Sequence, residues 1–254
     1  MKHLHIKRAL IYKIKDSVIG IGIFYAIMVI VTMAFVTGSL RFIINLDGTN
    51  GTSSSSFNGF GVAAIIGVFV IGIVSIREDL RLFLQNGTGR QTVFVVESLA
   101  AVLISAVLAI GGEILVSIAS ALVRSYDRIM INDLYHLIYT EGSTRSMTMM
   151  THIESVLIFF VFFICANIAG TFISLVFYRL NKIWTVIVAV GVPLFLIFGL
   201  PVLISYFNIS FAAPAAFLSS SPWALIAFAL LLSLVISLFN WLLLRRAPIK
   251  AVVS

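Results

Sequence analysis

Charged residues are what this sequence has least of. Only 11% of its 254 residues are Asp, Glu, Lys or Arg, while 61% are hydrophobic. Soluble domains carry about a quarter charged residues, so this balance excludes an ordinary soluble domain. It predicts an all-α integral membrane protein, because a helix satisfies its own backbone hydrogen bonds inside a bilayer.

Cysteines and catalytic motifs are also scarce. The single cysteine, Cys165, excludes a disulfide framework and a CxxC metal site. The sequence contains no GxxxxGK[ST], HExxH or GxSxG motif, which argues against ATP binding by a P-loop and against zinc or serine hydrolysis. We therefore expect no enzyme activity, cofactor or metal in this chain. The net charge of +7 is spread over the flanks of apolar runs, which favours contact with anionic lipid over nucleic acid.

Apolar runs predict six membrane-spanning helices within residues 17–244. Runs of spanning length begin at Ser17, Gly59, Val93, Ser155, Ile183 and Trp223. Residues 1–16 interleave basic and apolar side chains, which predicts an amphipathic helix on the membrane surface; a basic tail without fixed structure is the alternative. A short helix is expected within 129–139, and residues 245–254 form a tail.

One uncharged stretch is longer than two spans require. From Ile183 to Leu244 there is no charged residue in 62 positions, whereas each span needs about 20. The surplus residues, 206–222, are predicted to form a re-entrant excursion between the fifth and sixth spans, since backbone at that depth must be covered by protein or line a cavity.

The distribution of basic residues predicts the orientation. Thirteen of the 17 Lys and Arg residues fall on the N-terminal segment, the 77–90 loop, the 179–182 turn and the C-terminal tail. The positive-inside rule then places both termini in the cytoplasm, with the 206–222 excursion on the outer side of the membrane.

The polar groups within the spans are few. Glu97 is expected to reach interfacial water or to pair with an arginine of the adjoining loop, and Glu113 is expected near the opposite interface. Neither sits at the midplane, so no coupling-ion site is predicted. Asn167 is expected to hydrogen-bond a neighbouring helix, and Ala166 with Gly170 suits close helix packing. The phenylalanines of 159–163 are expected to face lipid.

The loop between the second and third spans has a helical pattern of its own. Ser75 with Glu78 fits a capping box, and Asn86-Gly87 supplies a helix stop. Between them, apolar and polar residues fall on opposite faces. The apolar face holds Ile76, Leu80, Phe83 and Leu84, and the polar face holds Arg77, Glu78, Arg81 and Gln85. This pattern predicts a short amphipathic helix at the membrane surface, with its polar face free to meet a partner.

This plan resembles the ABC-2-type permeases, the membrane subunits of bacterial ATP-binding-cassette exporters. The likeness lies in the amphipathic N-terminal segment, the six spans, the short loop after the second span and the outer excursion. The stretch REDLRLFLQNGTGRQTVF is similar to that family's first cytoplasmic loop. Within the family, the chain looks most like small permeases of Gram-positive bacteria, which include exporters of antimicrobial or cytolytic peptides such as phenol-soluble modulins.

The resemblance implies a partner and two sites. Residues 77–85 would be a coupling helix that docks on a separate ATPase, present in two copies, which would bind the ATP and Mg. A second permease would complete the dimeric pathway. The implied coupling residues are Arg77, Glu78, Asp79, Leu80, Arg81, Phe83 and Leu84. The implied outer gate holds Phe207, Phe211, Pro214 and Phe217.

Two other classes of function compete with export of an amphipathic peptide, drug or lipid-like cargo. One is a non-transport immunity or sensing subunit of the membrane. The other is an ion-coupled secondary carrier, which would predict an inverted repeat between residues 17–123 and 155–244. The sequence shows no such repeat, because the turn RLNK stands where the first half has its charged helix.

Overall fold

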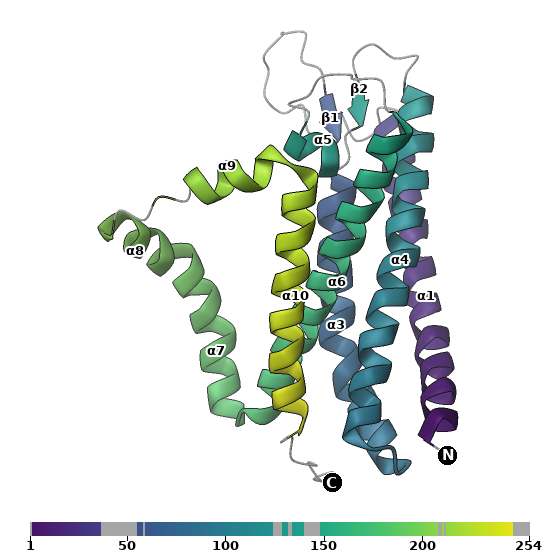
Figure 1. The fold of residues 1–254 in the computed structure, drawn as a ribbon, viewed down its shortest axis with the longest axis vertical. Helices are drawn as coiled ribbons and strands as arrows, with labels where there is room; N and C mark the ends of the chain where they lie inside the picture. Colours follow the sequence, from purple (N-terminus) through teal and green to yellow (C-terminus); the bar gives the residue numbers. More distant parts are fainter. Residues whose placement is uncertain are drawn as a thin grey trace.

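Long helices make up most of the chain in this computed structural model. It describes residues 2–36, 55–57, 59–123, 129–131, 134–139, 148–207, 210 and 212–245. A bundle is formed by α1 (Lys2–Val36), α3 (Gly59–Gln85), α4 (Arg90–Val123), α6 (Met149–Arg179) and α10 (Pro222–Arg245). These helices lie side by side in Figure 1, with the start of α1 and the end of α10 at the same end of the bundle.

Five helical stretches are long and apolar enough to cross a membrane. They are Ile6–Ala34, Arg90–Leu122, Met149–Arg179, Ile183–Tyr206 and Pro222–Arg245. The prediction of a helical multi-pass membrane protein is confirmed in this form. In α3 the apolar part is the shorter stretch Phe60–Ile76, so the sixth span stays a prediction.

The surface helix predicted over residues 1–16 is not a separate element. α1 runs without a break from Lys2 to Val36, so the N-terminal segment continues straight into the first span. No Pro lies within α1 to interrupt it. Ala9 and Lys13 are also buried against neighbouring helices, which holds this part of α1 upright in the bundle.

The predicted helix start at Ser75 is wrong, and the predicted stop is confirmed. α3 passes through Ser75 without interruption, because nothing in the sequence breaks the apolar helix that precedes it. The helix then ends at Gln85. Gly87 adopts a φ of 74°, and the Thr88 N–H donates to the Phe83 carbonyl at 2.9 Å, as in a Schellman cap.

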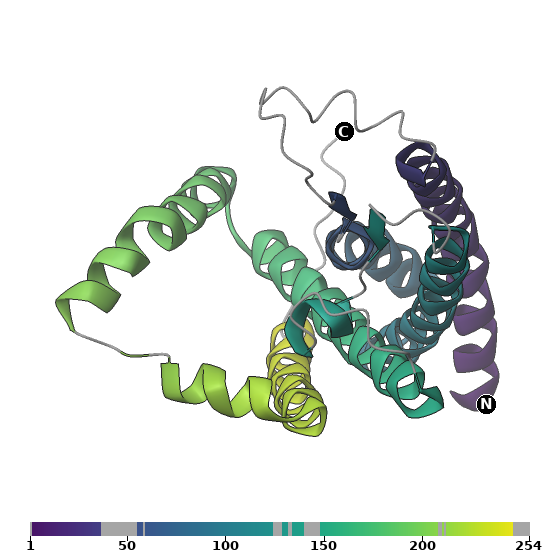
Figure 2. The ribbon, with the colours of Figure 1, turned by 90° about the horizontal axis from the view of Figure 1, so that it is seen from above.

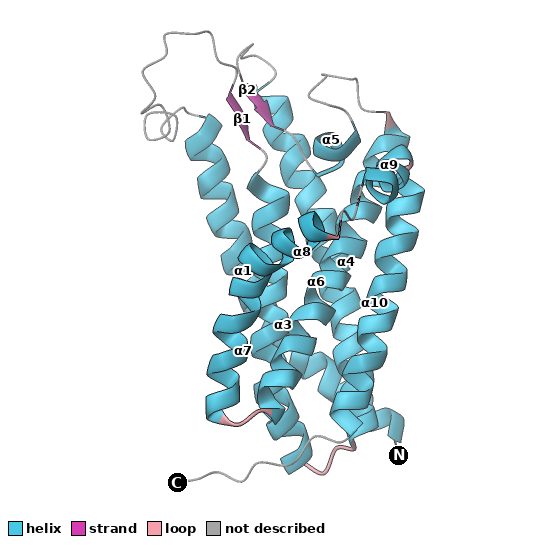
Figure 3. Ribbon diagram, turned by 90° about the vertical axis from the view of Figure 1, so that its left-hand side faces the viewer, coloured by secondary structure: helices cyan, strands magenta, loops and turns pink. Residues whose placement is uncertain are grey.

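The end of the bundle opposite the termini carries a small sheet and a short helix (Figure 3). β1 (Ser55–Phe57) pairs in parallel with β2 (Ile129–Ile131). The helix expected within 129–139 is therefore shorter than predicted, since α5 spans only Leu134–Tyr139. The β-branched residues of β2 suit a strand, and β1 supplies the backbone partner.

The helix of the predicted fifth span stands apart from the bundle. It consists of α7 (Lys182–Leu194), the π-helix η1 (Phe195–Gly199) and α8 (Leu200–Tyr206). Figures 1 and 2 both show it separated from the other helices, and none of its described side chains is buried. Prolines flank the π-helix at 193 and 201, and their missing N–H groups favour such local rewinding.

A short helix occupies part of the predicted excursion. α9 (Ala212–Ser220) lies across the end of α10 and leads into it (Figure 1). The Tyr139 hydroxyl of α5 donates to the Leu218 carbonyl at 3.0 Å, which ties this corner to the bundle. Burial and the nearby Glu154 carboxylate raise the pKa of Tyr139, so it remains a hydrogen-bond donor at neutral pH.

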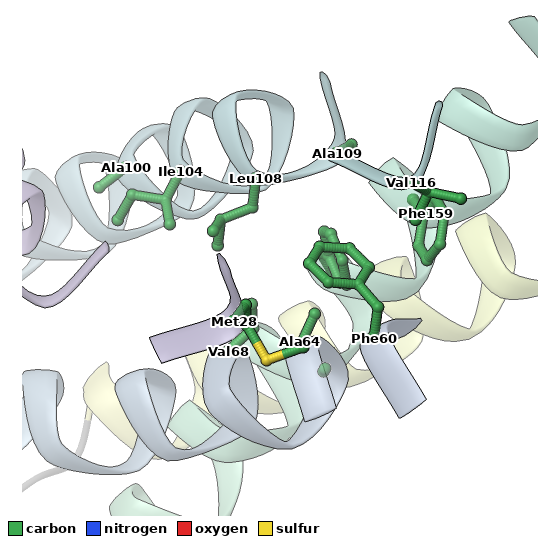
Figure 4. Packing of buried hydrophobic residues seen from close by; sticks show 12 residues of the cluster. Met28, Phe60, Ala64, Val68, Ala100, Ile104, Leu108, Ala109, Val116 and Phe159 are labelled. Atoms are coloured by element: carbon green, nitrogen blue, oxygen red, sulfur yellow. The ribbon is translucent and has the colours of Figure 1, made fainter. Parts of the chain in front are cut away.

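The main core lies between α1, α3, α4 and α6 (Figure 4). Phe60 packs edge-on against Phe159, with ring centroids 6.1 Å apart. Phe159 and Phe163 are fully buried, so the prediction that the 159–163 phenylalanines face lipid is wrong for these two. They lie four residues apart on the face of α6 that meets α3. The Phe159 ring packs there against Gly61.

A close backbone approach joins α3 to α6. A Cβ added to Gly72 would lie 2.3 Å from the Asn167 carbonyl oxygen, and one added to Gly170 would lie 2.2 Å from the Phe69 carbonyl oxygen. Backbone therefore meets backbone on both sides of the crossing. This confirms the packing role predicted for Gly170 and adds Gly72 to it.

We predict that Gly72→Ala or Gly170→Ala destabilises the protein by about 1–3 kcal/mol, because overpacking forces the two backbones apart. The measurement is the thermal unfolding midpoint in a fixed detergent. Gly20→Ala is the matched control, since nothing lies within 4 Å of its added Cβ and alanine favours the helix. Equal midpoints for all three variants would contradict the close crossing.

Candidate functional site

A buried ionic cluster joins α1, α3 and α4 near the end of the bundle that holds the N-terminus. We call Lys13, Ser75, Asp79 and Glu97 the Lys13 cluster. The Lys13 Nζ donates to both Glu97 carboxylate oxygens, at 2.6 and 2.7 Å. It also contacts the Asp79 carboxylate and the Ser75 hydroxyl. One ammonium group thus uses its three hydrogens on partners from two other helices.

The three charged side chains are shielded from solvent. Lys13 is 3% exposed, Asp79 6% and Glu97 8%. Removing one partner from a buried ion pair leaves an uncompensated charge, which costs far more than the loss of a surface pair. The cluster therefore holds α1, α3 and α4 in one register.

Apolar packing surrounds the cluster. Ile76, Leu80 and Phe83 of α3 are buried, and they belong to one hydrophobic group. Its other buried members are Ala9, Val93, Val96, Leu175 and Leu244. Leu80 and Phe83, which the sequence places on the apolar face of this segment, pack on the chain's own helix ends. This packing excludes water from the ions, which strengthens the attraction between them.

Asp79 is among the implied coupling residues, yet its carboxylate points inward and pairs with Lys13. The reason is helical position, since Asp79 follows Ser75 by one turn and both face α1. The coupling role itself stays a prediction. The side chains of Arg77, Glu78, Arg81 and Leu84 lie outside the described residues, although their backbone belongs to α3.

Glu97 has a different partner from the predicted ones. It is neither solvated nor paired with a loop arginine, because Lys13 neutralises it. The sequence reasoning missed Lys13, which was counted among the surface basic residues. A signal was present: Lys13 lies four residues after Ala9 and three after Leu10, which places it on the buried face of α1.

A second polar group lies nearer the opposite end of α4. The Ser155 Oγ donates to Glu113 Oε2 at 2.6 Å, and His152 Nδ1 lies 2.7 Å from Glu113 Oε1. Both contacts join Glu113 of α4 to side chains of α6, so this group is a polar contact between α4 and α6.

Two asparagines serve the contacts of α6. The Asn167 carbonyl meets Gly72 at the close crossing and accepts a hydrogen bond from the Thr171 hydroxyl at 3.0 Å. The Asn240 Nδ2 of α10 donates to the Ile168 carbonyl at 3.0 Å. These contacts of Asn167 are made by its backbone, so the hydrogen bond expected of its side chain stays a prediction. Asn240 gives α10 a polar attachment to α6.

The predicted gate residues lie on separate helices. Phe207 follows α8 and is exposed, while Pro214 and Phe217 are exposed on α9. Phe211 lies outside the described residues. The Phe207 ring stacks edge-on against Tyr206, with centroids 5.2 Å apart. The gate stays a prediction.

In the part of the chain that the structure describes, each of these polar groups joins neighbouring helices. Within that part, no group of three or more His, Cys, Asp or Glu side chains is placed to hold a metal ion. Comparison with family models, with curated proteins and with solved structures gave no match for this chain.

We predict that Lys13→Met lowers the free energy of unfolding by about 3–5 kcal/mol, because it leaves two buried carboxylates without a cation. The check is thermal unfolding in detergent. Lys15→Met is the control, since Lys15 is exposed on the same helix. Adding Asp79→Asn and Glu97→Gln to Lys13→Met should recover much of the loss. A Lys13 variant as stable as the Lys15 variant would contradict the cluster.

Proposed function

We propose that this chain is the membrane subunit of an ATPase-driven exporter, of the ABC-2 type that its sequence resembles. In this proposal α3 supplies the second of six spans through Phe60–Ile76, and both termini face the cytoplasm. A 17-residue apolar stretch is at the short limit for a span, and tight contact with α6 compensates for it.

The observation that carries the proposal is the continuity of α3. The helix runs past its apolar stretch to Gln85 and ends in a turn at the tip of the bundle. The segment that would meet an ATPase is therefore one rigid body with the span above it. A force applied to this turn therefore displaces the whole of α3, because no flexible joint separates the turn from the span.

The Lys13 cluster extends that continuity to two more helices. Asp79 lies within the proposed coupling segment, and Lys13 links it to α1 and to Glu97 of α4. Displacement of the coupling segment therefore acts on three helices at once. This gives Asp79 a transmitting role in place of the docking role that its charge suggested.

The outer part of the proposed pathway belongs to the helix that stands apart. None of the described side chains of α7, η1 and α8 is buried, so this helix can pack against lipid or a second permease. The π-helix and its flanking prolines provide a point at which it can bend. An apolar lining suits amphipathic peptides, drugs or lipids better than ions, which need polar ligands along their path.

An ion-coupled carrier is the second candidate, because the Lys13 cluster is a buried ionic group inside a membrane protein. Such groups often mark ion or proton pathways. The two candidates differ in their energy source. Cargo movement that persists without any ATPase and collapses with the proton gradient would favour the carrier.

We predict that the tagged chain, purified from its native membrane, retains an ATPase. Glu78→Arg and Arg81→Glu should each weaken this association by at least about tenfold, because charge pairs across an interface are sensitive to reversal. The measurement is the recovery of the ATPase by pull-down, followed by ATP hydrolysis and by efflux of a fluorescent amphipathic peptide, which inverted vesicles report as ATP-dependent uptake into their lumen.

Lys15→Glu is the control for these variants, because it reverses a charge on an exposed residue outside the coupling segment. It should retain the ATPase and the efflux. If both reversals within α3 leave association and coupled efflux intact, the assignment of the coupling segment is wrong. If no ATPase is retained by the unaltered chain, the exporter proposal itself fails.

A further inference from the structure

A cavity lies where α4 begins and α10 ends. Its volume is about 720 Å³, within the roughly 300–1,000 Å³ of ligand pockets. Its walls are the 87–92 segment together with Trp241 and Arg245. The loop contributes Gly87 and Gly89, which have no side chains to fill the cavity. It is separate from the Lys13 cluster, which lies inside the bundle.

The charge of this cavity is positive. Arg90 and Arg245 both line it, and the Arg90 Nη1 donates to the Arg245 carbonyl at 2.7 Å. Neither guanidinium has a carboxylate within ion-pairing distance in the part of the chain described here. A guanidinium has five N–H donors, so most of those on Arg90 remain available. Two such groups on one cavity fit a phosphate, which accepts paired hydrogen bonds from arginine.

The cavity also lies at the boundary between apolar and polar surroundings. Arg90 begins one spanning stretch and Arg245 ends another, so both guanidinium groups lie at the depth where lipid headgroups are found. Trp241 is one helical turn further in and stacks on Phe94, with centroids 5.3 Å apart. Tryptophan is the side chain typical of this interface.

Apolar surface continues from the cavity towards the membrane interior. Leu238 and Leu242 on α10 and Val95 and Leu99 on α4 are exposed. They offer a surface for acyl chains directly beyond the two arginines. A free phosphate would gain nothing from this surface, whereas a phospholipid would use both parts.

We propose that the cavity bounded by Arg90, Trp241 and Arg245 binds the phosphate of an anionic phospholipid headgroup. The lipid clamps the start of α4 to the end of α10, beside the turn that terminates α3. The site requires no ATPase, so it stands or fails independently of the proposed function.

The test measures lipid retained by the purified chain in detergent, by native mass spectrometry. The probes are phosphatidylglycerol and phosphatidylcholine with identical acyl chains. Arg90→Gln with Arg245→Gln should lower the affinity for phosphatidylglycerol by about 25-fold, at about fivefold for each arginine, and should change phosphatidylcholine binding little. Arg179→Gln is the matched control, because it removes an exposed arginine at the same end of the bundle, outside the cavity.

The second part of the test is competition with inorganic phosphate. Millimolar phosphate should not displace the lipid, because the acyl chains contribute to binding. Displacement at that concentration would show a site for a free anion and overturn the lipid assignment. Equal phosphatidylglycerol binding by the double variant and by Arg179→Gln would overturn the site altogether.

A measurement on the unaltered chain covers a double variant that fails to fold. Phosphatidylglycerol with a photoreactive headgroup should crosslink to residues 87–92 or 241–245, as read by peptide mass spectrometry. Crosslinks confined to other segments would overturn the proposal without any substitution.

Discussion

The attraction between one lysine and two carboxylates holds the N-terminal half of this molecule together. Lys13 reaches from α1 to Asp79 of α3 and Glu97 of α4, and the surrounding apolar side chains keep water away. Helices in lipid gain little from the hydrophobic effect against one another, so polar contacts and close packing decide their arrangement. The register of α1, α3 and α4 depends on this cluster, and the position of the turn after Gln85 depends on that register.

Close backbone approach serves the same purpose between α3 and α6. Gly72 and Gly170 permit a crossing that any larger residue would block, while Phe159 and Phe163 occupy the neighbouring space. α3 is thus held by charge towards α1 and α4 and by contact towards α6. In contrast, α7, η1 and α8 have neither kind of attachment among the described residues, which is consistent with a part that repositions.

The sequence was sufficient for the elements whose cause is local. Apolar runs predicted the long helices, and Asn86-Gly87 predicted the end of α3, because left-handed backbone needs particular residues. It was insufficient where a distant partner decides. Ser75 and Glu78 have the spacing of a capping box, but Lys13, 62 positions earlier, donates a hydrogen bond to the Ser75 hydroxyl. Asp79 looked like a surface charge because its partner lies on another helix. The β1–β2 pair likewise joins residues that no local pattern connects.

The crossing at Gly72 and Gly170 also implies a delay between the synthesis of α3 and its packing against α6. These residues are about 100 positions apart, and ribosomes add roughly 5–20 residues each second. The surface of α3 that receives α6 therefore lacks this partner for about 5–20 seconds after α3 has been made. During that interval this surface must be covered by lipid or by the insertion machinery, and the helix that displaces this occupant completes the bundle.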